Sequence, residues 1–549
     1  MGYEDEIKAG SAKHAPPADL VGKFQYGTAG FRMKAKDLDA VVYRVGLLAA
    51  LRSKKLNGQT VGVMITASHN PPEDNGVKLV DPMGEMLESS WEAYATSLAN
   101  ADSDQQLVDW YNNLAKNLRI NLDAPAKVIY ARDTRASGSR LVGCLQDALS
   151  ATGAQYTDFK LATTPQLHYY VRCTNTKGTQ DEYGEPTEKG YYEKLGAAFK
   201  QAMEHHKTSG GLVVDCANGV GGPKLRELVK YLPTAAEGGI DIKIVNDDVH
   251  KPDTLNSSCG ADYVKVNQRA PPSSKAGAND RCCSLDGDAD RIVFYFLDEK
   301  NTFRLLDGDR IATLAASFIG DLARQAGLGD KLNVGVVQTA YANGAATMYV
   351  ENNLKLPVIC TPTGVKHLHH AATRFDVGVY FEANGHGTVV FSPSALKTIH
   401  TCQPESPAQA DALSTLGALT DLINQTVGDA LSDMLLVEVI LAHKHYRCAD
   451  WLSSYTDLPN RLLKVEVPDR NQFQTQEGTA ERKLAQPQRI QDEIDKMVAK
   501  FSNGRSFARA SGTENAVRVY AEANTRAEAD DLAANVAAIV KKFGAVAGM

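Results

Sequence analysis

The chain lacks the features that mark secreted, membrane and nucleic-acid-binding proteins. Its nine cysteines contain no CxxC pair and are odd in number, which favours reduced thiols in the cytosol over a disulfide framework. The first residues contain no basic segment followed by an apolar run, so no secretory signal is visible, and no apolar stretch is long enough to span a membrane. The net charge of -7 argues against nucleic-acid binding, which usually requires a basic domain. We therefore expect a cytoplasmic protein without membrane or nucleic-acid partners.

A sequence repeat of short, fixed period is also lacking, which argues against a solenoid. The 549 residues exceed the size of one hydrophobic core, so three or four domains are expected. Short apolar runs alternate with helical patterns, which predicts α/β domains with mixed or parallel sheets. The predicted strands are residues 61–65, 127–131, 211–215, 240–245, 292–297, 334–337 and 377–381.

The last third of the chain contains a predicted boundary. The polar, turn-rich residues 452–477 separate a C-terminal block from the helix-rich segment that starts near Asp307. The C-terminal block ends in an amphipathic pattern that predicts a helix over 525–540, with Thr525 at the cap position.

A loop around Ser68 is the first candidate site. The segment TASHNPPEDNG, residues 66–76, follows an apolar run that predicts a buried strand. Pro71 and Pro72 exclude a helix or a central strand, and Asp74-Asn75-Gly76 favours a turn. The pattern predicts Ser68 on a stiff loop with an exposed oxygen, as a nucleophile requires. A serine that only caps a turn fits the same residues.

The segment DGDADR, residues 286–291, is a candidate metal loop. Asp286, Asp288 and Asp290 repel one another unless a cation lies among them, and carboxylate ligands suit Mg²⁺. An EF-hand is excluded because Arg291 stands where that loop needs glycine and Leu297 where it needs glutamate.

Two later loops suit a sugar phosphate. In EANGHGT, residues 382–388, Glu382 can accept hydrogen bonds from two hydroxyls, and Asn384 can both donate and accept. In RASGTENAVRV, residues 509–519, arginines and hydroxyls flank a glycine, as in an anion cradle without the Walker lysine. The segment KHLHH, residues 366–370, has no histidine pair four residues apart and no HExxH motif, so zinc is disfavoured there.

These motifs, taken in order with YGTAGFR (26–32) and TPTGVK (361–366), resemble the α-D-phosphohexomutase superfamily. The resemblance covers nearly the whole chain. It implies four α/β domains with mixed sheets flanked by helices around a central cleft, the last domain being a lid. The implied domains are 1–190 with the phosphoserine loop, 191–304 with the metal loop, 305–455 with the sugar loop and 456–549 with the phosphate-binding lid.

The resemblance also implies catalytic roles. Ser68 is the phosphoserine that donates and regains the phosphoryl group, and a stiff loop suits this role because in-line transfer tolerates little misplacement. His69, Lys78 and Arg32 are its catalytic neighbours. The proton acceptor remains open between His69, Lys78 and Lys366.

The implied ligand sites complete this set. Asp286, Asp288 and Asp290 hold one Mg²⁺ together with the phosphate on Ser68, and Arg291 is a charge partner of the phosphoserine. The implied substrate-binding residues are Thr363, Gly364, Lys366, Glu382, Asn384, His386, Arg509, Ser511, Gly512, Thr513 and Arg518.

Three features favour the branch of the superfamily that acts on N-acetylated sugars: Ala289 in the metal loop, Asn384 where serine is usual, and the chain length. The implied reaction interconverts the 6- and 1-phosphates of N-acetylglucosamine through a 1,6-bisphosphate, with a hexose 1,6-bisphosphate as activator and a monomer or weak homodimer as the enzyme. The alternatives are a phosphoglucomutase or phosphomannomutase, a metal-dependent phosphatase, and a silent paralogue, which would be expected to have lost Ser68 or an aspartate.

Overall fold

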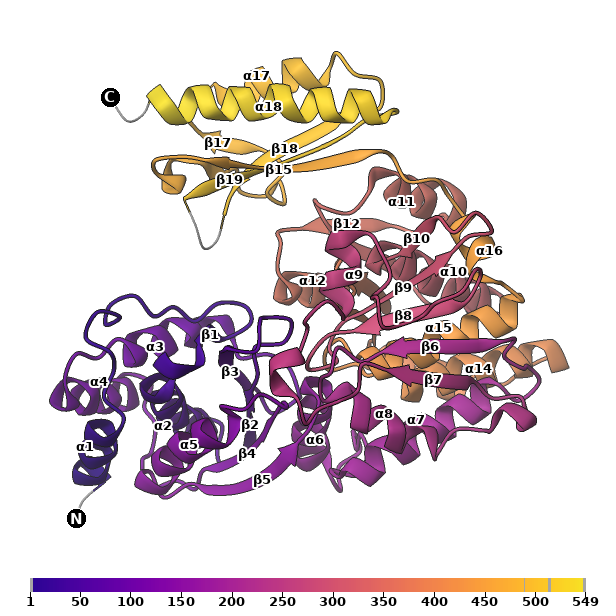
Figure 1. Ribbon diagram of the computed structural model, residues 1–549. Helices are drawn as coiled ribbons and strands as arrows, with labels where there is room; N and C mark the ends of the chain where they lie inside the picture. The colour runs from indigo at the N-terminus through magenta and orange to yellow at the C-terminus, as the bar shows by residue number, and fades with distance from the viewer. Residues whose placement is uncertain (1–2, 488, 512–514, 547–549) are drawn as a thin grey trace. The chain divides into compact units, whose positions relative to one another are not determined.

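The computed structural model describes residues 3–487, 489–511 and 515–546, which form two compact units (Figure 1). Unit 1 comprises Met1–Asp307, His386–Thr388 and Ser414–Cys448, and unit 2 comprises Gly308–Gly385, Val389–Leu413 and Ala449–Met549. The predicted fold class is confirmed, because both units consist of sheets flanked by helices. The division into four domains stays a prediction.

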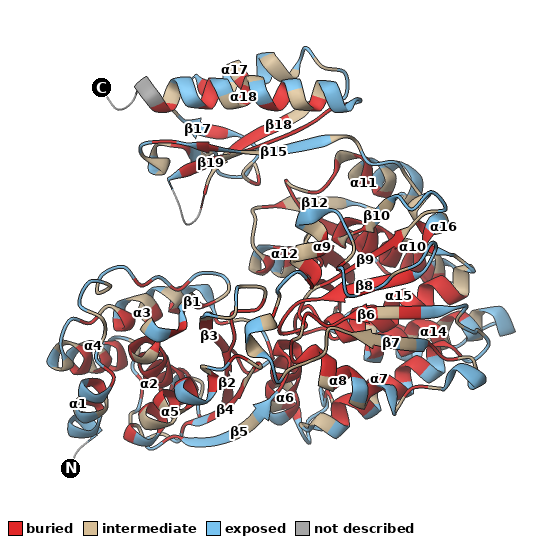
Figure 2. Ribbon diagram, in the orientation of Figure 1, coloured by how far each residue is buried: buried red, intermediate tan, exposed pale blue. Residues whose placement is uncertain are grey.

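The first sheet of unit 1 has the strand order β1-β3-β2-β4-β5. Strands β2, β4 and β5 are parallel, whereas β1 and β3 run antiparallel to their neighbours, so the sheet is mixed. All six residues of the central strand β2 are buried (Figure 2), as a continuous apolar run predicts. The strands are β1 (Phe31–Lys34), β2 (Thr60–Ile65), β3 (Asp74–Val80), β4 (Lys127–Arg132) and β5 (Gln155–Leu161).

Helices cover both faces of this sheet. Successive side chains of β2 point to opposite faces and contact the helices on each side. Val61 and Val63 belong to the hydrophobic core that includes α2 and α5. Gly62 faces the other way, where a Cβ would lie 2.7 Å from Val171 of α6. The helices of this part are α1 (Tyr3–Lys13), α2 (Asp39–Lys55), α3 (Ser89–Ala99), α4 (Asp104–Asn117), α5 (Gly138–Ala151) and α6 (Thr164–Thr176).

The second sheet of unit 1 has the order β10-β9-β8-β6-β7 and is also mixed. Its strands are β6 (Gly211–Asp215), β7 (Asp241–Val245), β8 (Arg281–Leu285), β9 (Ile292–Leu297) and β10 (Phe303–Leu306). Its helices are α7 (Glu188–Ala202), α8 (Gly221–Val229), α9 (Ala261–Asn267) and α15 (Ala430–Lys444). The turn between β8 and β9 carries the three aspartates of the predicted metal loop.

Unit 2 contains a four-stranded sheet of order β12-β11-β13-β14, in which β11 is parallel to both β12 and β13. Its strands are β11 (Val334–Thr339), β12 (Val358–Thr361), β13 (Val377–Phe381) and β14 (Gly387–Phe391). The helices are α10 (Gly308–Gln325), α11 (Gly344–Met348), α12 (Val365–Ala372) and α13 (Pro393–Thr401), while α14 (Pro407–Leu422) and α16 (Cys448–Leu452) belong partly to each unit.

The C-terminal part of unit 2 is an antiparallel sheet of order β15-β19-β18 with a small β16-β17 pair. Val517 and Val519 of β19 pack into a core with Leu532 and Val536 of the last helix, so the helices cover one face of the sheet. The elements are β15 (Asn460–Glu466), β16 (Gln474–Thr475), β17 (Leu484–Gln486), α17 (Ile490–Val498), β18 (Arg505–Ala510), β19 (Ala516–Glu522) and α18 (Arg526–Val546).

Most sequence expectations agree with these elements, and two need correction. Residues 460–466, predicted to be turn-rich, form strand β15 because Val465 is anchored in the C-terminal core. Asp74-Asn75-Gly76 begins strand β3, and the turn closes one step earlier, where Asp74 N donates to Pro71 O at 3.1 Å. All nine cysteines are free thiols. Among the described residues, no helix is long and apolar enough to cross a membrane.

Candidate active site

The Ser68 loop follows the buried strand β2, and its backbone is strained. Ser68 has φ +51°, in the left-handed region that non-glycine residues rarely occupy. Its N–H donates to Thr66 Oγ1 at 3.0 Å, and the Thr66 hydroxyl donates to Asp133 Oδ2 at 2.7 Å. The loop and strand end are therefore as predicted, but the exposed oxygen is not: Ser68 is fully buried.

A buried arginine clamps this loop. Arg135 Nη2 donates to the backbone oxygens of Ser68 and Asn70, both at 2.9 Å, and Nη1 donates to two further carbonyls of the loop. Asp133 fixes the guanidinium by accepting from its Nε at 3.0 Å. Asn256 Nδ2 donates to the same two oxygens at 2.9 and 3.1 Å. These contacts hold the strained serine in one position.

The three aspartates of the β8–β9 turn converge. Asp286, Asp288 and Asp290 are buried, and one oxygen from each lies within 4.8 Å of the others. The backbone curls at Ala289, which has φ +56°. Asp288 Oδ1 and Asp290 Oδ1 are buried without a hydrogen-bond donor, which is costly for carboxylates unless a cation is bound. The donor set therefore fits a hard cation such as Mg²⁺.

Ser68 and the aspartate turn touch directly. The Ser68 hydroxyl donates to Asp286 Oδ2 at 2.7 Å. Gly287 permits this approach, because a Cβ at that position would lie 2.6 Å from Ser68 O. Burial and the neighbouring Asp290 raise the pKa of Asp286 well above its usual range. Burial alone would also raise the pKa of Asp290, but His386, Lys78 and Arg291 outweigh it and hold that pKa below its usual range.

Three cationic side chains face these carboxylates. Lys78 Nζ lies 3.7 Å from Asp288 Oδ2 and 3.6 Å from Asp290 Oδ2. Arg291 Nε lies 3.9 Å from oxygens of Asp286 and Asp290, and its Nη1 is 3.0 Å from Asp262.

The third cation is Arg32. Burial and the nearby Arg291 lower the pKa of Arg32, while the three aspartates oppose this shift. Lys78, Arg291 and Arg32 thus oppose the negative charge of the three aspartates, while Asp262 also pairs with Arg291.

Two histidines adjoin the same region. His69 Nδ1 lies 3.4 Å from Ser68 Oγ, and burial together with Arg291 lowers the pKa of His69 to about 4. His386 belongs to unit 1 and lies 2.6 Å, through Nδ1, from the backbone oxygen of Asp290. It therefore contacts the metal loop, whereas Glu382 and Asn384 of the same motif belong to unit 2.

The predicted sugar residues of unit 2 lie at the ends of strands. Asn384 Nδ2 donates to Glu382 Oε2 at 3.3 Å in the turn between β13 and β14. Gly364 has φ +125° and precedes α12, whose first turn contains Lys366. A glycine is needed at this conformation because it has no Cβ.

The face of the C-terminal sheet opposite α17 and α18 carries a row of cations. Arg509 on β18 pairs with Arg518 on β19, which pairs in turn with Lys464 on β15. Residues directly opposite on antiparallel strands project to the same face, and like charges there repel. This basic row is therefore suited to an anion.

A carboxylate occupies one end of the basic row. Glu481 Oε1 lies 3.1 Å from Arg509 Nη2, and its Oε2 accepts from the backbone N–H of Thr363 at 2.9 Å. Glu481 thus bridges the predicted phosphate loop and the predicted orientation loop within unit 2. Ser511 is buried beside the row, with its N–H donating to Ala516 O at 2.8 Å. Gly512 and Thr513 lie outside the described residues.

Several supporting residues were not among those predicted. Thr164 Oγ1 donates to Asp288 Oδ2 at 2.6 Å. The segment ARDTRASG, residues 131–138, carries Arg132, Arg135 and Ser137 after a strand and is a further candidate from the sequence, but the role of Arg135 as a clamp requires the tertiary fold. Lys464 lies on β15, within residues 452–477, whose polar composition predicts turns rather than a strand. Nothing in the sequence distinguished Asn256 or Glu481 from other polar loop residues.

Family models match most of the chain in four parts. The alpha/beta/alpha domain I and the C-terminal domain of phosphoglucomutase/phosphomannomutase match residues 35–106 and 462–539. Domains II and III of phosphoacetylglucosamine mutase AMG1 match residues 179–293 and 307–446. Together with the buried serine beside three aspartates, these matches define a phosphohexomutase, as the motifs predicted.

Comparison with individual relatives shows which family of phosphohexomutases the chain belongs to. A phosphoacetylglucosamine mutase of Candida albicans is 51% identical, over 98% of this chain and all of its own. The crystal structure of Aspergillus fumigatus N-acetylphosphoglucosamine mutase with GlcNAc-6P and magnesium is 66% identical, with a TM-score of 0.95 and 99% of each chain covered. A serine-to-alanine variant of that enzyme with glucose 1,6-bisphosphate has a TM-score of 0.93, the same identity and the same coverage. The chain belongs to the phosphoacetylglucosamine mutase family.

Proposed function

We propose that this enzyme interconverts N-acetylglucosamine 6-phosphate and N-acetylglucosamine 1-phosphate through a phosphoserine at Ser68 and a 1,6-bisphosphate intermediate. The observation that carries the proposal is the 2.7 Å contact between the Ser68 hydroxyl and Asp286, on a loop clamped by Arg135 beside two further aspartates. The ligands of the Aspergillus fumigatus relative, GlcNAc-6P with magnesium and glucose 1,6-bisphosphate, support the same reading.

The reaction consists of two phosphoryl transfers. In the first, the bond between phosphorus and Ser68 Oγ breaks while a sugar hydroxyl oxygen bonds to phosphorus and its proton passes to a base. In the second, the other phosphate of the bisphosphate passes to Ser68 Oγ and leaves a free sugar hydroxyl. Arg135, Asn256 and Thr66 fix Ser68 for both transfers, since in-line transfer depends on position.

Asp286, Asp288 and Asp290 would hold Mg²⁺, together with a phosphate oxygen on Ser68. A bound Mg²⁺ neutralises charge on the transferred phosphoryl group. Lys78, Arg291 and Arg32 supply further positive charge from the protein. We assign the basic row, with Ser511, Gly512 and Thr513, to the phosphate that is not reacting. Glu382 and Asn384 bind sugar hydroxyls, and the loop of Thr363, Gly364 and Lys366 orients the sugar.

We propose four domains, 1–190, 191–304, 305–455 and 456–549, of which the last is the phosphate-binding lid. Small sugar phosphates are the partners, and the enzyme acts as a monomer or weak homodimer. Nine cysteines without a disulfide support a cytoplasmic location.

Intact-protein mass with peptide mapping tests the mechanism. Incubation with glucose 1,6-bisphosphate should add one phosphate to Ser68, and N-acetylglucosamine 6-phosphate with Mg²⁺ should remove it. Ser68→Ala should bind substrate but lose turnover. Turnover without any phosphate on Ser68 would refute the mechanism, and net phosphate release would indicate a phosphatase.

A substitution at Asn384 tests the sugar specificity. Asn384→Ser restores the residue usual in glucose and mannose enzymes. It should reduce the ratio of kcat/KM for N-acetylated over plain hexose phosphates. An unchanged ratio would remove Asn384 from the specificity argument.

A further inference from the structure

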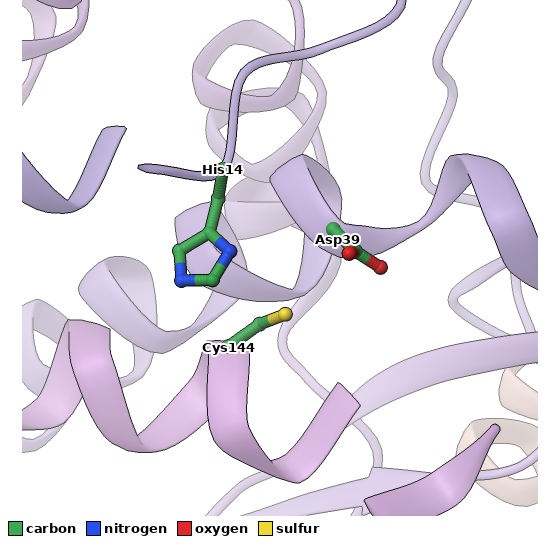
Figure 3. A group of neighbouring side chains, drawn as sticks. All are labelled: His14, Asp39 and Cys144. Carbon is green, nitrogen blue, oxygen red and sulfur yellow. The ribbon is translucent and has the colours of Figure 1, made fainter. Parts of the chain in front are cut away.

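A second group of side chains that could hold a metal ion lies in unit 1, outside the candidate active site. His14 follows α1, Asp39 begins α2, and Cys144 lies within α5. One nitrogen, one oxygen and the sulfur lie within 4.8 Å of one another, with His14 and Cys144 buried. Figure 3 shows the three side chains on three separate segments. No step of the proposed reaction uses them.

The surroundings of His14 leave one ring nitrogen available toward the other two side chains. Its Nε2 lies 2.7 Å from Asp147 Oδ2, and this carboxylate also pairs with Lys13. A carboxylate beside Nε2 keeps the proton on that nitrogen and leaves the lone pair on Nδ1. Figure 3 shows the Nδ1 edge of the ring on the side of Asp39 and Cys144. A histidine supported by a carboxylate in this way is the usual arrangement at zinc.

We propose that His14, Asp39 and Cys144 form a binding site for Zn²⁺ or a similar transition-metal ion. One sulfur, one nitrogen and one oxygen donor suit zinc, whereas Mg²⁺ prefers oxygen donors alone. Zinc bonds of about 2.0–2.3 Å would draw the three ligand atoms slightly closer together. Three protein ligands leave the fourth tetrahedral position to water.

The charges around the site are compatible with a bound ion. Binding requires the Cys144 thiol, which donates to Arg140 O at 3.5 Å, to release its proton to solvent. Thiolate and carboxylate then balance the two charges of the metal. Arg140 pairs with Asp39 and also donates to Ala35 O at 2.7 Å. It can remain in place as a support for the carboxylate.

The position of the site indicates a structural role. The ligands connect the end of α1 to α2 and α5, so a bound ion would fasten the N-terminal helix to the core of unit 1. Metal affinity adds directly to stability when the unfolded chain lacks the site. Zinc should therefore raise the Tm without changing turnover in Mg²⁺.

Cobalt titration of the full chain tests this site. With the protein held in excess Mg²⁺, Co²⁺ should produce a thiolate-to-cobalt charge-transfer band in the near ultraviolet, and Zn²⁺ should abolish it. The aspartate site has only oxygen donors and cannot give this band. Cys144→Ser should lose the band, whereas the matched control Cys173→Ser, at a buried cysteine on α6, should keep it.

A second variant keeps the test decisive if Cys144→Ser fails to fold. Asp39→Asn retains the sulfur, so the band should remain at saturation while the apparent Kd for Co²⁺ rises by about tenfold or more. Absence of the band in the unmodified protein would overturn the proposal. Its persistence in Cys144→Ser, or an unchanged Kd in Asp39→Asn, would equally overturn it.

Discussion

The acidic turn of unit 1 gathers negative charges, whereas the basic row of unit 2 gathers positive charges. The two regions balance these charges in different ways. In unit 1, Asp286, Asp288 and Asp290 are buried, and Lys78 and Arg291 are held beside them. In unit 2, the basic row lies on a sheet face where Lys464 is exposed. Its Arg509 contacts Glu481, a carboxylate from the turn between β16 and β17.

The acidic turn is preorganised, because its charges are buried and held in place, whereas the basic row can adjust to a ligand. Charges act strongly in a buried, low-dielectric environment and weakly at a hydrated surface. Under the proposed function, the acidic turn should therefore control whether phosphoryl transfer occurs. The basic row should control how tightly a phosphate is held, because an incoming phosphate would compete with the carboxylate of Glu481 for Arg509. Substitutions in the two regions should differ in size and in the kinetic constant they change.

The largest effect is expected from Asp288→Asn. The amide removes one of three carboxylates at the proposed metal site while retaining the shape of the side chain. The Mg²⁺ concentration for half-maximal activity should rise by more than about tenfold, since even indirect contacts to a metal are worth 10–100-fold. Activity is measured against Mg²⁺ concentration. Asp298→Asn, in the turn after β9, is the control; equal responses in both variants would exclude Asp288 from the metal site.

The clamp on Ser68 should give the next largest effect. Arg135→Lys keeps the charge beside Asp133 but removes most donors to the Ser68 loop. The kcat should fall by about 10²-fold, because misplacement of a reacting group by about 1 Å has this cost. The KM should change little, and Arg132→Lys serves as the control. A rise in KM with kcat unchanged would instead show that the clamp serves substrate binding.

The fold was predictable from the sequence wherever one segment determines its own environment. Three predicted strands, 211–215, 292–297 and 377–381, agree with β6, β9 and β13 at both ends, and in β9 and β13 a continuous apolar run is buried on both sheet faces. The cap at Thr525 is confirmed, since its hydroxyl accepts from Glu528 N at 3.2 Å. Strand β15 was missed because only one of its seven residues, Val465, is buried.

The site residues likewise divide into those that a short segment reveals and those that depend on the tertiary fold. The motif residues were recognisable because each short segment carries its own chemistry, such as three alternating carboxylates. Arg135, Asn256 and Glu481 act on partners more than 60 residues away in sequence, with separations of 67, 188 and 118 residues. No local pattern records such contacts. The buried state of Ser68 likewise depends on packing that a loop sequence does not reveal.

A substitution of Lys464 tests whether the basic row contributes to phosphate affinity. Lys464→Gln removes the exposed end of the basic row. The KM for N-acetylglucosamine 6-phosphate should rise by about fivefold with little change in kcat, as expected for an exposed charge contact near 1 kcal/mol. The effect should shrink at high salt. Lys496→Gln on α17, which lies over the other face of the sheet, should leave KM unchanged. A shift in both variants would indicate a general charge effect.

Glu481 should give the smallest effect, and in the opposite direction. Glu481→Gln keeps an oxygen that can accept from Thr363 N but removes the negative charge beside Arg509. Because the substrate phosphate no longer competes with a carboxylate, KM should fall by about threefold, within the range of partly exposed ion pairs. Steady-state kinetics would measure this against Glu477→Gln, an exposed control in the same turn. A higher KM would instead mean that the carboxylate holds Arg509 in its binding position, and the basic row would then be as preorganised as the acidic turn.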